Sequence, residues 1–277
     1  MSDIHARNMD IKKVLEDTRH PPSLDRLRWR NDVVTPRIMV AAHPKSGSTW
    51  VTGALAELVQ YDVGRFCYAW SSNEHDLYPP ALIVRKDRGE ISQMHVRATP
   101  HNVTLIQDFA IKPVVLTRNV FDTVVSVARD IQKKHENSKA APGVQGYSFV
   151  WFSSLPQDAE LEDYIDYSID FFIPWYINFL LSWECYRSHT ASIFVRYEDV
   201  RTNPKVEFSS IVEKLKLERV SEIDYASDPL SSSSMISSTK SENFSGLEVL
   251  GAARIARIKS LFRHCRSPFC TEHLDEA

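Results

Sequence analysis

One lysine and several hydroxyl side chains gather around a glycine in the segment Pro44-Lys-Ser-Gly-Ser-Thr-Trp50. A short apolar run, residues 38–42, stands before it, and a helical pattern begins just past Gly47. A loop between a buried strand and a helix points backbone N–H groups, hydroxyls and an ammonium into the space above the first helical turn, where the helix dipole also favours negative charge. These residue types at this spacing therefore predict a site for an anionic ligand, most simply a phosphate.

The loop differs from the phosphate loop of nucleoside-triphosphate enzymes, G-x-x-x-x-G-K-[ST]. Aligned on Gly47, Ala42 replaces the first glycine, Ser48 replaces the lysine, and Lys45 lies inside the loop. Such enzymes need the lysine between the β- and γ-phosphates and Mg²⁺ on the hydroxyl, so the pattern favours a different donor. A P-loop kinase or NTPase remains an alternative, as does a purely structural turn.

The same run resembles the 5′-phosphosulfate loop, P-K-[ST]-G-[ST]-[ST]-W, of the sulfotransferases that use 3′-phosphoadenosine 5′-phosphosulfate (PAPS). A second run, Arg118-Asn-Val-Phe-Asp-Thr-Val-Val-Ser126, resembles the second signature of that family, R-N-x-x-D-x-x-V-S. The resemblance implies a P-loop-like α/β fold, with a central, mostly parallel sheet flanked by helices on both sides. It also implies in-line transfer of a sulfuryl group from PAPS to a hydroxyl, less often an amine, with release of adenosine 3′,5′-bisphosphate (PAP).

The resemblance further implies roles for individual residues. Lys45 would stabilise the leaving phosphate, and Arg118 with Ser126 would hold the 3′-phosphate. His95 resembles the histidine of the family's K-T-H segment and would be the general base, because a neutral imidazole can accept a proton near pH 7. The remaining positions that resemble nucleotide contacts are Ser46, Gly47, Ser48, Thr49, Trp50 (on adenine), Tyr197 (in a Y-E-D segment) and Lys240.

The sequence also departs from the family pattern. Gln93 stands where the family has a lysine, two places before the histidine, and no R-K-G-x-x-G-D-W run follows Ser231. These departures favour a bacterial or otherwise divergent member, and they leave open a non-catalytic nucleotide-binding relative. Among the other histidines, His101 is a reserve candidate for the base, and His43 is expected beside the loop rather than on the substrate.

Further apolar runs predict the elements that position these residues. Strands are expected at 91–95, 112–118 and 192–197, ending on a histidine, an arginine and a tyrosine. The carboxyl ends of parallel strands are where open α/β sheets bind ligands. Helices are expected at about 121–135, 161–187, 203–217 and 247–263, and the aromatic residues spaced by four within 161–187 are expected in the core.

Length and composition limit the remaining choices. The 277 residues and net charge of −3 predict one sulfotransferase domain that binds neither nucleic acid nor a membrane, with an arm at 1–36, a core at 37–216 and a divergent part at 217–277. Four cysteines without zinc spacing predict reduced thiols and no metal. With no signal peptide or apolar run of about 18 residues, a soluble, cytoplasmic protein is expected. Aromatic residues within 66–78 and 147–152 favour an apolar or aromatic small-molecule acceptor, and the oligomeric state cannot be inferred.

Overall fold

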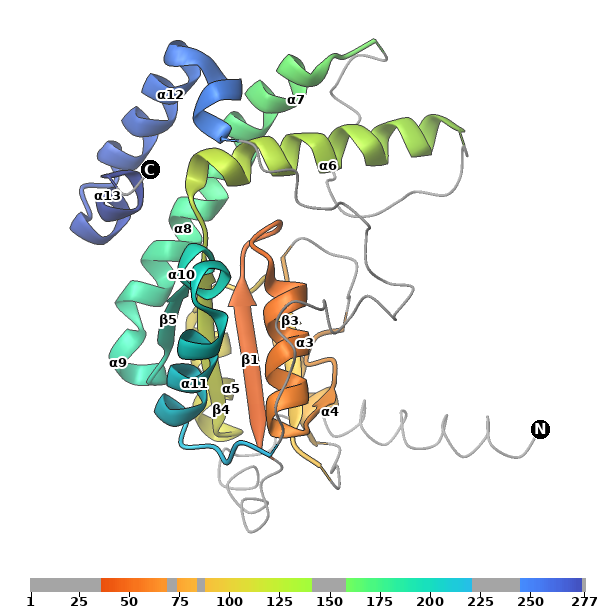
Figure 1. The fold of residues 1–277 in the computed structure, drawn as a ribbon, viewed down its shortest axis with the longest axis vertical. Coiled ribbons are helices and arrows are strands. Elements are labelled where there is room, and N and C mark those ends of the chain that lie inside the picture. Colours follow the sequence, from red (N-terminus) through yellow and green to blue (C-terminus); the bar gives the residue numbers. More distant parts are fainter. Residues whose placement is uncertain (1–35, 69–73, 84–87, 141–157, 221–244, 276–277) are drawn as a thin grey trace.

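The centre of the molecule is a parallel sheet whose strands lie in the order β2-β3-β1-β4-β5 (Figure 1). The computed structural model describes residues 36–68, 74–83, 88–140, 158–220 and 245–275, and within them the sheet has five strands. The expected α/β class is therefore confirmed. The strands are β1 (Arg37–Ala42), β2 (Asp62–Val63), β3 (Glu90–Met94), β4 (Ile111–Thr117) and β5 (Ile193–Arg196).

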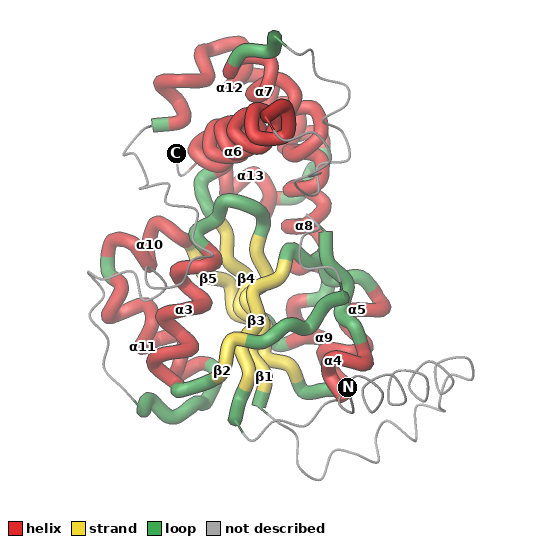
Figure 2. The backbone as a smooth tube through the Cα atoms, turned by 90° about the vertical axis from the view of Figure 1, so that its right-hand side faces the viewer, coloured by secondary structure: helices red, strands yellow, loops and turns green. Residues whose placement is uncertain are grey.

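The central strand β1 is buried on both faces because its side chains alternate between two hydrophobic cores. Ile38 and Val40 belong to one core, and Met39 and Ala41 belong to the other. The tube in Figure 2 shows helices on both sides of the sheet. The first core is covered by α3 (Ser48–Val59) and α11 (Pro204–Lys214), and the second by α5 (Pro100–Asp108) and α8 (Ile173–Cys185).

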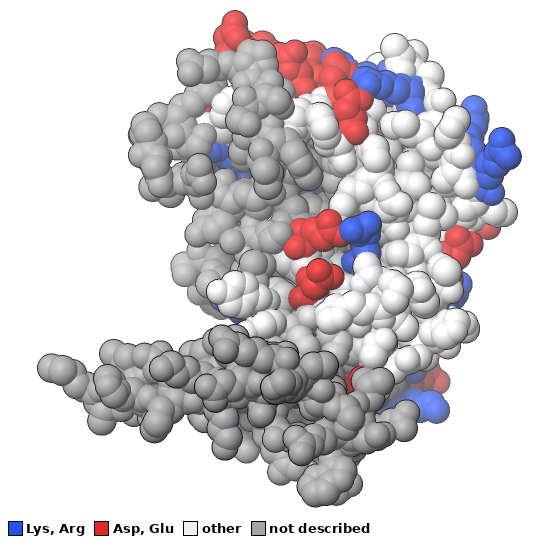
Figure 3. All heavy atoms as spheres, turned by 180° about the vertical axis from the view of Figure 1, so that it is seen from behind, with Lys and Arg blue, Asp and Glu red and all other residues white. Residues whose placement is uncertain are grey.

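A layer of helices lies beyond the carboxyl ends of the strands (Figure 1). Its longest member, α6 (Val120–Ala140), crosses above β1 and packs against α7 (Leu161–Tyr167) and the kinked α12 (Gly246–His264). Arg254 pairs with Asp166 of α7 at 2.8 Å, which fastens α12 to α7. Figure 3 shows acidic and basic side chains next to one another at this upper end of the molecule, while most of the other described surface on that face is uncharged.

The predicted strands and helices are found with their ends shifted by a few residues. The predicted helix at 161–187 is one continuous run, but it contains a π-helical turn, η3 (Ser168–Phe172), and it ends at Cys185. Its aromatic stripe is core, as predicted, because Trp183 is fully buried and donates from Nε1 to the Val96 carbonyl at 2.9 Å. The remaining elements are α4 (Pro79–Ile83), α9 (Arg187–Thr190), α10 (Tyr197–Thr202) and α13 (Pro268–Asp275).

Some expectations concern parts of the chain that the structure does not describe. Residues 1–35, the aromatic segment 147–152 and Lys240 lie outside the described residues. Within the described residues, no helix is both long and apolar enough to cross a bilayer. All four cysteines are described and carry free thiols, as predicted.

Candidate active site

The loop after β1 bends sharply at two residues with positive φ. Lys45 has a φ of 64° and Gly47 has a φ of 81°, which is a conformation that glycine adopts without strain. Gly47 caps α3, and the first hydrogen bond of that helix runs from the Val51 N–H to the Gly47 carbonyl at 3.2 Å. The N–H groups of Ser48, Thr49 and Trp50 therefore stand at the open end of the helix, the position from which backbone amides bind anions.

The ring of Tyr197 joins this loop to the residue that follows β4. A Cβ on Gly47 would lie 2.3 Å from the Tyr197 ring, so only glycine fits here. The Arg118 guanidinium lies 4.9 Å from the centre of the same ring, and its Nη1 donates to the Lys45 carbonyl at 2.9 Å. The ends of β1, β4 and β5 thus bring Lys45, Gly47, Arg118 and Tyr197 into one contact group.

Two further features of this group suit a nucleotide. Trp50 is partly exposed and meets Tyr197 edge-on at 6.4 Å and Phe208 at 5.6 Å, which holds the indole beside the loop. Arg118 retains a buried donor, because no described residue accepts a hydrogen bond from its Nε. An aromatic surface and an arginine donor therefore both lie against Tyr197.

His95 follows the last residue of β3 and is fixed in one tautomer. Its Nδ1 lies 2.8 Å from the Ala42 carbonyl. Since a carbonyl oxygen only accepts, Nδ1 carries the proton and Nε2 is left as an acceptor. Burial, followed by the nearby His75, lowers the pKa of His95 to about 4, so the ring is neutral at neutral pH. A neutral imidazole with an open Nε2 is the form that a general base requires.

His75 supports this histidine and was not singled out by the sequence. The two rings stack with their centres 5.4 Å apart, and the His95 N–H donates to His75 Nδ1 at 2.9 Å. The His75 N–H donates in return to the His95 carbonyl at 2.7 Å. His75 lies in an irregular loop far from any motif, so no pattern in the sequence indicates this pairing.

Asp130 on α6 is a second residue that the sequence analysis missed. Its Oδ1 lies 3.5 Å from Lys45 Nζ, and its Oδ2 lies 2.6 Å from Lys134 Nζ. Asp130 follows Ser126 by four residues, so the two share one face of α6, and Ser126 lies one turn closer to Arg118. The spacing of four from the predicted Ser126 is the signal that could have identified Asp130.

Gln93, the departure from the family pattern, also belongs to this site. Thr49 Oγ1 donates to Gln93 Oε1 at 3.2 Å, which links the loop to β3. Because strand side chains alternate, Gln93 points to the same side of the sheet as His95. A neutral amide therefore occupies a place beside the loop and the histidine.

The other predicted residues take different positions. Ser46 and Ser48 are buried within the loop, and Ser126 is partly exposed on α6. His43 is fully buried, and its Nδ1 lies 2.9 Å from the Pro44 carbonyl, which leaves it behind the loop. His101 is exposed on α5 and directs its Nε2 toward the Leu77 carbonyl at 3.4 Å, so it takes no part in the contact group.

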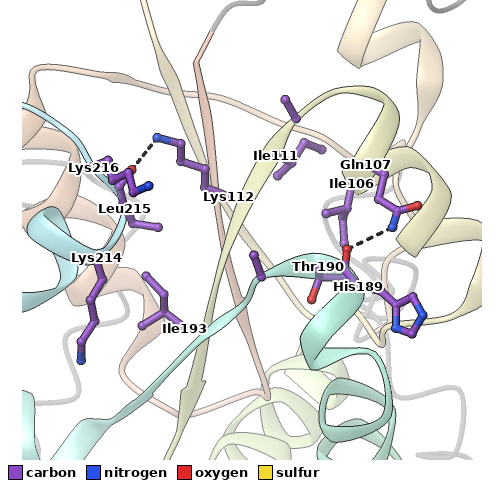
Figure 4. Close-up of a pocket in the computed structure, with 12 residues that line it drawn as sticks. Ile106, Gln107, Ile111, Lys112, His189, Thr190, Ile193, Lys214, Leu215 and Lys216 are labelled. Carbon is purple, nitrogen blue, oxygen red and sulfur yellow. Dashed lines mark hydrogen bonds between the residues drawn. The ribbon is translucent and has the colours of Figure 1, made fainter.

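A hollow of about 340 Å³ opens at the opposite edge of the sheet, beside the first residues of β4 and β5 (Figure 4). Lys112, Lys214 and Lys216 line it, and Lys112 Nζ donates to the Leu215 carbonyl just past the end of α11. Ammonium groups at a helix C-terminus stabilise its carbonyls and its dipole. These lysines are therefore explained by the end of α11, and we place the site at the other edge.

Comparison with known proteins shows the family of this chain. Residues 35–276 match the family model described as the sulfotransferase domain. The solved structure of mouse sulfotransferase SULT7A1 complexed with PAP is similar with a TM-score of 0.57 and 16% identity, over 93% of this chain and 94% of that chain. A sulfotransferase from Alicyclobacillus acidocaldarius gives a TM-score of 0.42 and 13% identity, over 83% of this chain and 97% of that chain. No curated protein is significantly similar in sequence.

Proposed function

The chain belongs to the sulfotransferase domain family, and we propose that it transfers a sulfuryl group from PAPS to the hydroxyl of a small-molecule acceptor, releasing PAP. The mouse protein that shares its fold was solved with PAP, which supports the choice of donor. The observation that carries the proposal is the hydrogen bond from Arg118 Nη1 to the Lys45 carbonyl, at 2.9 Å. It brings the two segments that resemble phosphate-binding signatures to one place.

In the proposed nucleotide site, each end of the donor has its own group of residues. Lys45 and the amides of Ser46 to Thr49 would bind the 5′-phosphosulfate, as expected at a helix N-terminus. Arg118 and Ser126 would bind the 3′-phosphate, to which an arginine can donate two hydrogen bonds. Trp50 and Tyr197 would contact the adenine.

The proposed reaction is a direct in-line displacement. His95 Nε2 takes the proton from the acceptor hydroxyl as its oxygen attacks the sulfur. The new S–O bond forms while the bond from sulfur to the phosphate oxygen breaks, and the electron pair leaves with PAP. Lys45 stabilises the charge that develops on that oxygen, which is electrostatic stabilisation of the transition state. The Ala42 carbonyl holds the imidazole in the tautomer that this step needs.

The proposed acceptor is an apolar or aromatic hydroxyl compound. Of the aromatic residues expected to line its pocket, Phe66 is fully buried and belongs to the core, whereas Tyr68 is 82% exposed and packs on Tyr78 at 5.4 Å.

We also propose that the chain forms a single domain. In support, Leu250 and Phe262 of α12 lie in the same hydrophobic core as the strand residue Met39.

The proposal is tested by incubating the protein with labelled PAPS and a panel of phenols, alcohols, sugars and amines. We expect transfer to a hydroxyl compound, and we expect His95→Ala to lower kcat by about 10²- to 10⁴-fold while PAP binding is kept. His101→Ala, a histidine outside the contact group, is the control and should retain full activity. If the parent binds PAP but sulfates nothing in the panel, a non-catalytic nucleotide-binding role replaces the proposed one.

A further inference from the structure

Asp130 connects two lysines that come from different parts of the chain. Lys45 lies in the loop after β1, and Lys134 lies one turn beyond Asp130 on α6. The carboxylate oxygens are 3.5 Å and 2.6 Å from the respective ammonium nitrogens. Two ammonium groups and one carboxylate give this cluster one net positive charge, and all three side chains are at least partly shielded from solvent.

The cluster lies close to the proposed base. Both Lys134 and Asp130 act electrostatically on His95, the lysine lowering its pKa and the aspartate raising it. Lys45 contacts Asp130 from the loop after β1, so the cluster joins the proposed phosphate loop to residues that act on His95 at the carboxyl edge of the sheet. This is the region in which the proposed reaction places the sulfuryl group.

Lys45 alone cannot neutralise the negative charge of the donor. A phosphosulfate carries negative charge on both its phosphate and its sulfuryl oxygens, and Lys45 shares its own charge with Asp130. Gln93, which lies on the same side of the sheet as His95, supplies only a neutral amide. A second cation near the sulfuryl oxygens would stabilise the transferring group by direct electrostatic contact.

An ion pair between residues four apart on one helix is also a common stabilising feature of helices, worth about 0.2–0.5 kcal/mol. Asp130 differs from such a pair because its second oxygen faces Lys45 on another element. The carboxylate therefore links Lys134 to the loop through Lys45.

We propose that Lys134 is a second catalytic cation, held by Asp130 beside Lys45 so that its ammonium contacts the sulfuryl oxygens of the donor. This inference rests on the proposed function and extends it by assigning a residue outside the segments that resemble the family signatures. Lys134 contacts the donor, whereas Asp130 is a positioning residue that acts through both lysines.

The test compares the affinities for PAPS and PAP by calorimetry without an acceptor. The two nucleotides differ by the sulfuryl group, so a residue that contacts this group affects PAPS more. Lys134→Met should weaken PAPS binding by about tenfold and PAP binding by less than about twofold. Lys134→Arg should restore most of the lost PAPS affinity, because it keeps the charge. Lys133→Met, at the exposed neighbouring position on α6, is the matched control and should change neither affinity.

A second readout does not depend on the nucleotide. Removing the Lys134 charge should raise the pKa of His95, measured by NMR of its imidazole, whereas Lys133→Met should leave it unchanged. Equal loss of PAPS and PAP affinity, no loss of either, or an unchanged pKa of His95 in Lys134→Met would overturn the inference while the proposed function stands. A parent protein that binds neither nucleotide would overturn the proposed function and this inference together.

Discussion

At the scale of single residues, the surroundings of His95 decide in which form the proposed base is present. The Ala42 carbonyl accepts from Nδ1, so the acceptor nitrogen is Nε2. Burial and His75 both disfavour the charged imidazolium, and they lower the pKa of His95 to about 4 from an ordinary value near 6.5. The base is therefore deprotonated over the whole neutral range.

This depressed pKa predicts the pH dependence of activity. Protonation removes the acceptor on Nε2, so kcat/KM, which reports the free enzyme, should remain constant as the pH falls through 6.5 and should decline with a midpoint near pH 4. The measurement is a profile of initial rates at a fixed PAPS concentration, with circular dichroism at each pH to establish that the protein stays folded. A midpoint near 6.5 in folded protein would contradict the environment described for His95.

Only some residues of this site can be predicted from the sequence around them. The loop at 44–50 and the segment at 118–126 are contiguous runs, so their residues could be predicted directly. The contacts of Asp130 with Lys45 and of His75 with His95 join residues that the fold brings together from distant or irregular segments. The spacing from Ser126 points to Asp130 itself, but no pattern in the sequence indicates its contact with Lys45 or the pairing of the two histidines. The side chains that act on the charge of Lys45 and on the pKa of His95 could therefore be identified only from the structure.

At the scale of elements, one junction fixes α12 to the start of α6. The Gly246 N–H donates to Asp122 Oδ1 at 2.7 Å, and a Cβ on Gly246 would lie 2.3 Å from the Phe121 carbonyl carbon. Asp122 lies in the first turn of α6, where a carboxylate also interacts favourably with the helix dipole. Its side chain also accepts from another helix, because Asn119 Oδ1 already accepts from the first amides of α6.

The junction predicts a loss of stability when its carboxylate is removed. Asp122→Ala should lower the free energy of unfolding by about 1.5–3 kcal/mol, since a hydrogen bond to a charged group is lost and the Gly246 N–H is left without this acceptor. Asp122→Asn keeps an acceptor oxygen and should lose less. Urea denaturation monitored by circular dichroism gives both values. Equal losses in the two variants, or no loss in Asp122→Ala, would show that the contact does not stabilise the junction.

The elements that sequence predicted best are those with a strong local signal. Apolar runs identify β1, β3, β4 and β5 because each lies in a sheet covered by helices on both faces. The two-residue β2 and the π-helical turn η3 have no such signal, since they arise from pairing with β3 and from packing within a continuous helix. The final helix α13 is only eight residues long, and it packs against α8 and α12.

At the scale of the whole molecule, topology explains why the signatures meet. β1 lies between β3 and β4 and leads into α3 on one face, whereas β3 leads into α5 on the other face. Loops that leave neighbouring strands toward opposite faces open a crevice at the carboxyl edge, the common ligand site of open α/β sheets. The helical layer of α6, α7 and α12 lies above this edge (Figure 1). This crevice is where we propose that a nucleotide with phosphates on its 3′ and 5′ positions binds.

Calorimetric titration with PAP tests this placement most directly. We expect one PAP per chain to bind, Arg118→Ala to weaken binding by at least about tenfold because the guanidinium contact with the 3′-phosphate is lost, and Arg263→Ala, at an exposed position on α12, to leave it unchanged. No heat of binding with PAP, or an affinity that Arg118→Ala leaves intact, would contradict a nucleotide site formed by the ends of β1 and β4.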